Sequence, residues 1–228
     1  MNGTSRLKAF IMDISLPVFL LLGATLLIFL TDADIRLASF FYSPHSGWFL
    51  KDQPLWQFFY QYGMIPAFLF AFIALATVLA GFFDHRFTRY RKKAIFLLLL
   101  LVIGPGLVIN TTLKDHWKRP RPSDISSFGG SHPYLPIWKF GDDQQSRSFP
   151  SGHAAIGYYL LAPFFLFRKR SRHLARFFLG AGLIYGSLMG FGRMVQGGHF
   201  FSDVVWSCGL VYITGVVLYY LLRMDLNS

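Results

Sequence analysis

Met64–Phe83 reads MIPAFLFAFIALATVLAGFF and contains no charged side chain. A run of about 20 apolar residues is long enough for an α-helix to cross the hydrocarbon core of a bilayer. Five comparable runs occur elsewhere in the chain: Ile14–Leu30, Ala94–Leu113, Ser151–Phe167, Phe177–Phe191 and Val204–Leu222. Charged residues make up only 14% of the 228 residues, whereas a soluble domain carries roughly a quarter. The sequence therefore predicts an all-α integral membrane protein, built as a six-helix bundle.

The basic residues indicate the orientation of this bundle. The chain has 22 Lys and Arg residues and a net charge of +11. More than half of these basic residues lie near the two ends of the chain and in two short loops: Arg6, Lys8, the segments 86–93 and 168–176, and Arg223. Because basic residues favour the cytoplasmic side of a membrane, we expect both termini in the cytoplasm. This pattern explains much of the positive charge, so we expect no nucleic acid as a partner.

We expect a single domain over residues 1–228, with its core at about 64–222. Residues 1–63 then form the first span and an interfacial segment. The aromatic side chains of Thr31–Gly63 suit either a membrane anchor or a wall that guides a lipid toward a site. The single cysteine, Cys208, excludes an intramolecular disulfide.

The third apolar run contains two features that break its uniformity. Gly104, Pro105 and Gly106 follow one another, which predicts a kink that neighbouring helices accommodate. Asn110 lies one turn before the end of the run, where we expect it to form a hydrogen bond to another helix.

Three polar segments lie at ends of the apolar runs, and the predicted topology places all three on the side opposite the termini. They are Lys114–Pro122 (KDHWKRPRP), Pro150–His153 (PSGH) and Arg193–Asp203 (RMVQGGHFFSD). Their basic residues oppose the positive-inside tendency, and an anionic substrate is the simplest reason for that. Together they supply cations, two histidines and a carboxylate, a set that suits the binding of a phosphate and the cleavage of its ester.

His199 and Asp203 are four positions apart, so a helix that begins near Gly198 would place them on one face. The carboxylate would then accept the imidazole N–H and leave the other ring nitrogen free as a nucleophile. The other interpretation is a His–Asp pair that only holds two helix ends together.

Ser151, Gly152 and His153 stand at a predicted helix start, where free N–H groups favour an anion. We expect Ser151 either to donate a hydrogen bond to that anion or to cap the helix. His153 lies just inside the helix, in a position to protonate a leaving alkoxide.

Lys114, Arg121 and Arg193 are the predicted phosphate-binding cations. Lysine offers a point charge, whereas the planar arginine fork holds two phosphate oxygens at once. These charges would stabilise a transferring phosphoryl group without a metal or another cofactor. Lys118 and Arg119 fit the binding of anionic lipid headgroups better, or of a second anionic group on a large substrate.

In this order, the patterns K-x6-RP, PSGH and R-x5-H-x3-D resemble the three-part signature of the type 2 phosphatidic acid phosphatase (PAP2) superfamily. The resemblance covers about Met64–Leu222. It implies a nucleophilic, transiently phosphorylated His199, an orienting Asp203, a general acid–base His153, and five phosphate-holding residues: Lys114, Arg121, Arg193, Ser151 and Gly152. One position departs from the pattern, because Gly192 stands where many members have a serine.

The wider strings GPGLVIN, KDHWKRPRP and RMVQGGHFFSDV are similar to bacterial phosphatases that remove a phosphate from lipid A at the outer face of the inner membrane. This resemblance implies a multi-pass inner-membrane protein with a periplasmic site and a phosphorylated membrane lipid as substrate. Undecaprenyl pyrophosphate and phosphatidylglycerophosphate remain alternative substrates, and transfer of the phosphate to another lipid remains an alternative reaction. The oligomeric state stays open.

Two other classes of protein fit the sequence less well. Vanadium haloperoxidases have a similar site, but they are soluble. A lipid-binding scaffold or transporter with a degenerate site usually lacks one of the catalytic histidines or the aspartate, and this chain has all three.

Overall fold

The computed structural model describes residues 3–226, and this part of the chain contains helices and no β-strand. The prediction of an all-α protein is therefore confirmed. The helices are α1 (Gly3–Leu30), α2 (Ala33–Ser39), α3 (Pro54–Tyr62), α4 (Ile65–Phe83), α5 (His85–Leu101), η1 (Val102–Leu113), α6 (Lys114–Trp117), η2 (Pro122–Asp124), η3 (Ser126–Phe128), α7 (Gly152–Tyr158), η4 (Tyr159–Leu161), α8 (Pro163–Phe167), α9 (Arg172–Val195), α10 (Phe201–Leu221) and η5 (Met224–Leu226).

Five helical stretches between residues 3 and 226 are long and apolar enough to cross a membrane. They are Thr4–Leu30, Pro54–Phe83, His85–Asp124, Arg172–Val195 and Phe201–Leu221. The remaining predicted span, Ser151–Phe167, is an apolar helical stretch over Gly152–Phe167 that is shorter than these five. Its helix tightens into the 3-10 turn η4 and restarts at Pro163, which has no backbone N–H to continue the ladder. The chain is thus a multi-pass membrane protein.

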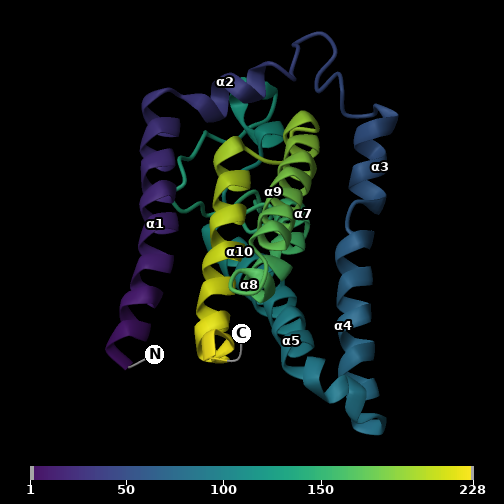
Figure 1. Ribbon diagram of the computed structural model, residues 1–228. Helices are drawn as coiled ribbons and strands as arrows, with labels where there is room; N and C mark the ends of the chain where they lie inside the picture. Colours follow the sequence, from purple (N-terminus) through teal and green to yellow (C-terminus); the bar gives the residue numbers. More distant parts are fainter. Residues whose placement is uncertain (1–2, 227–228) are drawn as a thin grey trace.

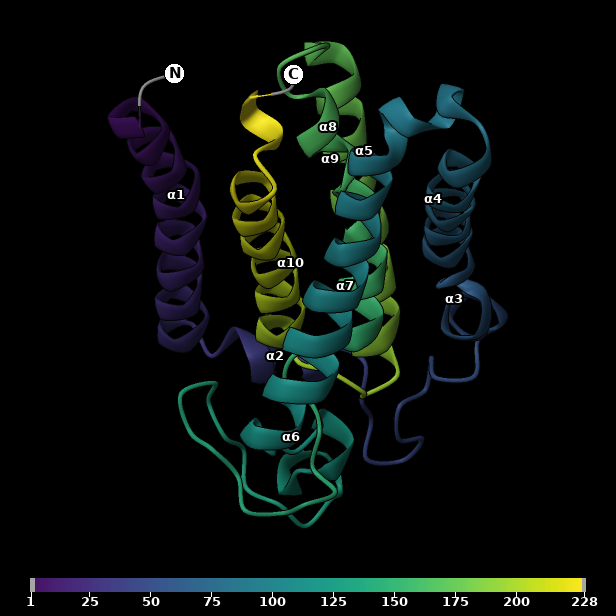
Figure 2. The same cartoon turned by 90° about the horizontal axis from the view of Figure 1, so that it is seen from below.

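The long helices lie side by side, and the chain begins and ends at the same end of the bundle (Figure 1). α10 contacts α1, α7 and α9, whereas α3 and α4 lie at the far edge of the bundle, where α4 packs against α5. α2 crosses the opposite end. Figure 2 shows the segment after α6 spread beyond that same end. This opposite end therefore gathers the loops that carry the three polar segments.

The segment between α1 and α4 packs against the third polar segment and the end of α9. Trp48 packs so closely on Gly197 that a Cβ atom there would lie 2.4 Å from the indole. Trp56 of α3 lies beside Gly192 in the same way, at 3.2 Å from the position of a Cβ atom. These contacts favour the interpretation of residues 31–63 as a wall beside the third polar segment.

The predicted kink at Gly104–Gly106 takes the form of a π-helical stretch, η1, which includes Pro105. π-helical turns recur at functional sites in proteins. The expectation that Asn110 bonds to another helix is wrong, because its Nδ2 donates to the carbonyl of Pro105 at 2.8 Å within η1. Its Oδ1 accepts a hydrogen bond from Nζ of Lys114 at 3.4 Å. The side chain therefore satisfies the disturbed backbone and orients the lysine that follows.

Glycines allow α9 to approach its neighbours closely. A Cβ atom at Gly186 would lie 2.1 Å from the ring of Tyr158, and one at Gly190 would lie 2.3 Å from Val204. Small residues at helix interfaces let helices pack tightly in membranes, where no hydrophobic effect drives their association. α9 is thereby held against both α7 and α10.

We predict that Gly182→Ala destabilises the protein. The new Cβ atom would lie 2.3 Å from the backbone nitrogen of Leu161, so one helix has to move. Overpacking of this kind costs about 1–3 kcal/mol of the free energy of unfolding. Gly180→Ala is the matched control, because nothing lies within 4 Å of its Cβ position. Thermal unfolding in detergent should show a lower midpoint for Gly182→Ala only, and equal midpoints would refute this packing.

Candidate active site

The three polar segments meet at the end of the bundle that α2 crosses. Backbone groups join them: the N–H of Ser123, the residue after the first segment, donates to the carbonyl of Gly197 at 3.0 Å, and the N–H of Ser151 donates to the carbonyl of Asp203 at 3.3 Å. Ser207 of α10 donates its hydroxyl to the carbonyl of Ser151 at 2.9 Å. The segments are thus fixed relative to one another by the main chain as well as by side chains.

His199 and Asp203 lie together, although not on one helix face as predicted. α10 begins at Phe201, so His199 belongs to the loop before the helix. Its Nδ1 lies 3.5 Å from Oδ2 of Asp203, a separation longer than a good hydrogen bond. The loop folds back because Gly197 has a φ of +69°, and because the N–H of Phe200 donates to Oδ2 of Asp203 at 2.8 Å. The expected helix start near Gly198 was therefore wrong, but the pairing of the two side chains is present.

The environment of His199 keeps its imidazole neutral. The side chain is 3% exposed, and burial is the main reason why its pKa falls to about 4. The charges of Lys114 and Arg193 lower the pKa further, whereas the contact with Asp203 acts in the opposite direction. Since Nδ1 faces Asp203, the unprotonated nitrogen available to a substrate is Nε2.

Two of the three predicted cations, Arg121 and Arg193, have unsatisfied donors in the described part of the chain. The buried Nε atoms of Arg121 and Arg193 have no hydrogen-bond partner within the described residues. Arg193 is held in place by Gln196, which accepts from Nη1 at 2.5 Å, and by Tyr60, whose ring lies 4.6 Å from the guanidinium carbon. Buried N–H groups are nearly always paired, so these two unpaired groups are donors that an anion could satisfy.

His153 is half-buried at the start of α7 and stacks on Tyr60, with ring centroids 5.1 Å apart and an angle of 19° between the planes. The positive charges of Arg193, Lys114 and Arg121 all act on its imidazole. His153 therefore shares one electropositive site with these cations. Tyr60 contacts both His153 and Arg193. In the sequence, the only indication of this role is that Tyr60 belongs to an aromatic-rich segment.

Ser151 and Gly152 lie at the same helix start. The hydroxyl of the buried Ser151 accepts a hydrogen bond from the N–H of Ala154 at 3.4 Å, so it acts as the N-cap of α7, one of its two predicted roles. A Cβ atom at Gly152 would lie 2.3 Å from Oδ1 of Asn110. Any side chain at this position would displace the residue that orients Lys114.

The glycine that departs from the family pattern is in contact with an aromatic side chain. Gly192 lies against Trp56, and a Cβ atom would come within 3.2 Å of the indole ring. A serine here would crowd Trp56.

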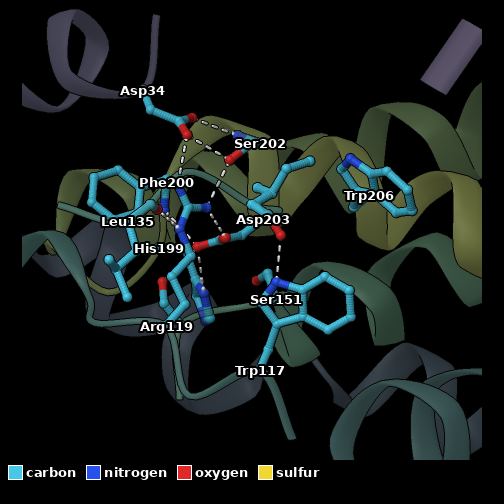
Figure 3. A network of polar contacts seen from close by, with 12 residues as sticks. Asp34, Trp117, Arg119, Leu135, Ser151, His199, Phe200, Ser202, Asp203 and Trp206 are labelled. Carbon is cyan, nitrogen blue, oxygen red and sulfur yellow. Dashed lines mark hydrogen bonds and ion pairs between the residues drawn. The ribbon is translucent and has the colours of Figure 1, made fainter. Parts of the chain in front are cut away.

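The expectation for Arg119 is wrong, because this side chain is fully buried and so cannot bind lipid headgroups. Its Nη1 pairs with Oδ1 of Asp203 at 2.6 Å and its Nη2 pairs with Oδ2 of Asp34 at 2.8 Å (Figure 3). Ser148 donates its hydroxyl to Oδ2 of Asp203 at 2.5 Å, and Ser202 donates to Asp34. These partners of Arg119 are not evident from the sequence alone. The sequence gives no signal for the pairing of Arg119 with Asp34, because the two residues are 85 positions apart.

The membrane-spanning fold and a buried histidine near basic side chains are the features expected of a membrane protein that acts on a phosphorylated substrate. Residues 93–226 match the family described as the PAP2 superfamily. The chain therefore belongs to the PAP2 superfamily, and the predicted resemblance is confirmed.

Curated proteins similar to this chain share the name lipid A 4'-phosphatase. The chain is 36% identical over 193 residues to the lipid A 4'-phosphatase of Francisella tularensis subsp. novicida, covering 83% of this chain and 86% of that protein. It is 34% identical over 120 residues to the lipid A 4'-phosphatase of Rhizobium leguminosarum, which covers 51% of this chain and 50% of the relative. No solved structure matches the chain.

Proposed function

We propose that this protein is a lipid phosphatase that hydrolyses the 4'-phosphomonoester of lipid A through a phosphohistidine intermediate. The reaction rests on one observation above all: a buried, neutral His199 faces Asp203 and lies among cations whose Nε atoms have no partner in residues 3–226. The choice of substrate is supported by the relative from Francisella, which this chain matches over most of its length.

In the first step, Nε2 of His199 attacks phosphorus and the bond from phosphorus to the sugar oxygen breaks. Asp203 stabilises the positive charge that develops on the imidazole. His153 gives a proton to the departing sugar alkoxide. A bound phosphate dianion offsets the charges of Lys114, Arg121 and Arg193 and so favours the protonated form of His153. The same cations stabilise the charge on the transferring phosphoryl group.

In the second step, His153 takes a proton from water while the water oxygen attacks phosphorus. The P–N bond to His199 breaks, its electron pair returns to the imidazole, and inorganic phosphate leaves. Each residue is then back in its starting state. Ser151 and Gly152 fix the position of His153 by capping and starting α7.

The apolar part of a lipid substrate also has space beside this site. A cavity of about 1170 Å³ lies between α1, α9 and α10, and its lining is almost entirely apolar. Phe191 and Phe201 belong to this lining, and they lie at the ends of α9 and α10 that carry Arg193 and Asp203. Acyl chains in this cavity would place a phosphorylated headgroup near the histidines.

We further propose that six segments cross the bacterial inner membrane, with the site in the periplasm. Ion pairs gather basic residues at the end of the bundle where the chain begins and ends: Arg168 pairs with Asp13 at 2.6 Å, and Arg6 pairs with Asp225 at 2.9 Å. The positive-inside rule supports a cytoplasmic position for that end. The polar segments lie at the other end of the bundle (Figure 1).

The proposal is tested by inorganic phosphate release from purified protein in detergent. Lipid A, undecaprenyl pyrophosphate, phosphatidylglycerophosphate and phosphatidic acid are compared in parallel, each with wild-type protein and the His199→Ala variant. We expect wild-type release from lipid A far above that from the other three. A preference for another lipid would refute the substrate, whereas no release from any of them by folded protein would refute hydrolysis itself.

We predict that Arg121→Lys lowers kcat/KM on lipid A by about 10- to 100-fold. A charged hydrogen bond contributes about 1.5–3 kcal/mol, and lysine cannot reproduce the bidentate fork. Arg36→Lys, at an exposed position of α2, is the control and should match wild-type activity. Equal kcat/KM values for Arg121→Lys and wild type would show that Arg121 does not hold the phosphate.

A further inference from the structure

Asp34 is a buried carboxylate that the proposed chemistry does not use. It lies in the first turn of α2, is 2% exposed, and faces the beginning of α10. Its Oδ1 accepts from the N–H of Ser202 at 2.8 Å. Its Oδ2 accepts from the hydroxyl of Ser202 at 2.6 Å and from Tyr134 at 3.1 Å. Asp34 thus binds the first turn of α10, the turn that carries Asp203, to α2.

Arg119 connects Asp34 to Asp203. One guanidinium nitrogen pairs with each carboxylate, and Nη1 also donates to the hydroxyl of Ser202 at 2.8 Å (Figure 3). Its Nε donates to the carbonyl of Leu135 at 2.8 Å, and the guanidinium carbon lies 4.4 Å from the centre of the Phe200 ring. The guanidinium is therefore held on all sides, and its position fixes one oxygen of Asp203.

The charges of this network explain why two carboxylates are needed. A single arginine paired with Asp203 alone would neutralise the carboxylate that has to stabilise a positive imidazole. With Asp34 on its other side, Arg119 divides its charge between two partners, and the buried group of three retains one net negative charge. Buried charges are tolerated only when they are paired and hydrogen-bonded, and every charge in this group is.

We propose that Asp34 is a positioning residue for the reaction: through Arg119 it sets the orientation and the charge of Asp203 beside His199. This inference rests on the proposed function, because it assigns Asp34 a part in that same phosphohistidine chemistry. Asp34 lies outside residues 93–226, which match the superfamily, so the N-terminal segment completes the site.

The test compares Asp34→Asn with Asp32→Asn, the same chemical change at an exposed position two residues earlier. Both full-length variants are purified in detergent, and their folding is compared by thermal unfolding. We expect Asp34→Asn to lower kcat on lipid A at least tenfold while KM changes less than threefold, and Asp32→Asn to match wild type. A wild-type kcat in folded Asp34→Asn would overturn the proposal.

A double-mutant cycle separates positioning from a merely structural contribution. If Asp34 acts through Asp203, then adding Asp34→Asn to Asp203→Asn should lower the residual kcat less than twofold. A tenfold loss in both backgrounds would overturn the proposal, because the two residues would then act independently. Should Asp34→Asn fail to fold, Ser202→Ala removes one hydroxyl from the same network and is tested in the same cycle: we expect a kcat loss that disappears in the Asp203→Asn background.

These experiments distinguish an error in the role of Asp34 from an error in the proposed function. Wild-type protein that releases no phosphate from lipid A contradicts the proposed function before any variant is compared. Wild-type protein that releases phosphate, together with a fully active Asp34→Asn variant, contradicts only the role of Asp34.

Discussion

Replacing His199 with alanine should lower phosphate release from lipid A by at least about 10⁴-fold, the largest loss we expect from any single change. The variant has no Nε2 to form the covalent intermediate, although Lys114, Arg121 and Arg193 can still bind the phosphate. Binding of the lipid should therefore survive. The measurement is inorganic phosphate release, together with an alkaline quench to trap labelled phosphate on the protein, since phosphohistidine is labile in acid.

His173 provides a matched control for this substitution. It lies in the first turn of α9, where its side chain is exposed. His173→Ala should retain wild-type turnover and the trapped phosphoenzyme. Near-normal turnover by His199→Ala, or a protein-bound phosphate that persists in it, would show that another group is the nucleophile.

Asp203→Asn should lower kcat by about 10³-fold and leave KM close to the wild-type value. The amide has no charge to stabilise the imidazolium, and its NH2 group can face His199 Nδ1 and impose the wrong tautomer. The basic side chains that are proposed to bind the phosphate are unchanged in this variant, so phosphate binding should be retained. Steady-state kinetics on lipid A separates these two effects.

The same substitution leaves Arg119 with one carboxylate fewer, and breaking a buried ion pair costs about 3–5 kcal/mol of the free energy of unfolding. Activity is therefore compared at a temperature at which thermal unfolding shows the variant to be folded. Asp142→Asn, at an exposed loop position, serves as control and should keep full activity. A rise in KM with an unchanged kcat would mean that Asp203 contributes to substrate binding and not to the chemical step.

The sequence predicts the helices well because a bilayer imposes a strong constraint on composition. Uncharged runs such as Met64–Phe83 have to be helical in lipid, where every backbone polar group needs an internal partner. The run over Ser151–Phe167 does not form one continuous α-helix, since it is broken by η4 and by Pro163. Hydropathy reports apolar length but does not show where a helix tightens or restarts.

The chemistry-bearing residues were also visible in the sequence, since histidine, arginine and aspartate at fixed spacing imply a limited set of reactions. What the sequence did not show is which charges pair with which. Arg119 and Arg121 stand two positions apart, yet Arg119 is fully buried between two carboxylates while Arg121 has an unpaired Nε. That difference depends on Asp34, which is distant in sequence and reaches the site only because α2 folds over the start of α10.

The most direct test is mass spectrometry of lipid A after incubation with purified wild-type protein. We predict a product that has lost only its 4'-phosphate, an equal amount of inorganic phosphate in solution, and unchanged lipid A in the His199→Ala sample. Lipid A that stays intact with folded wild-type protein, or a product that forms equally well with His199→Ala, would contradict a lipid A phosphatase that acts through this histidine.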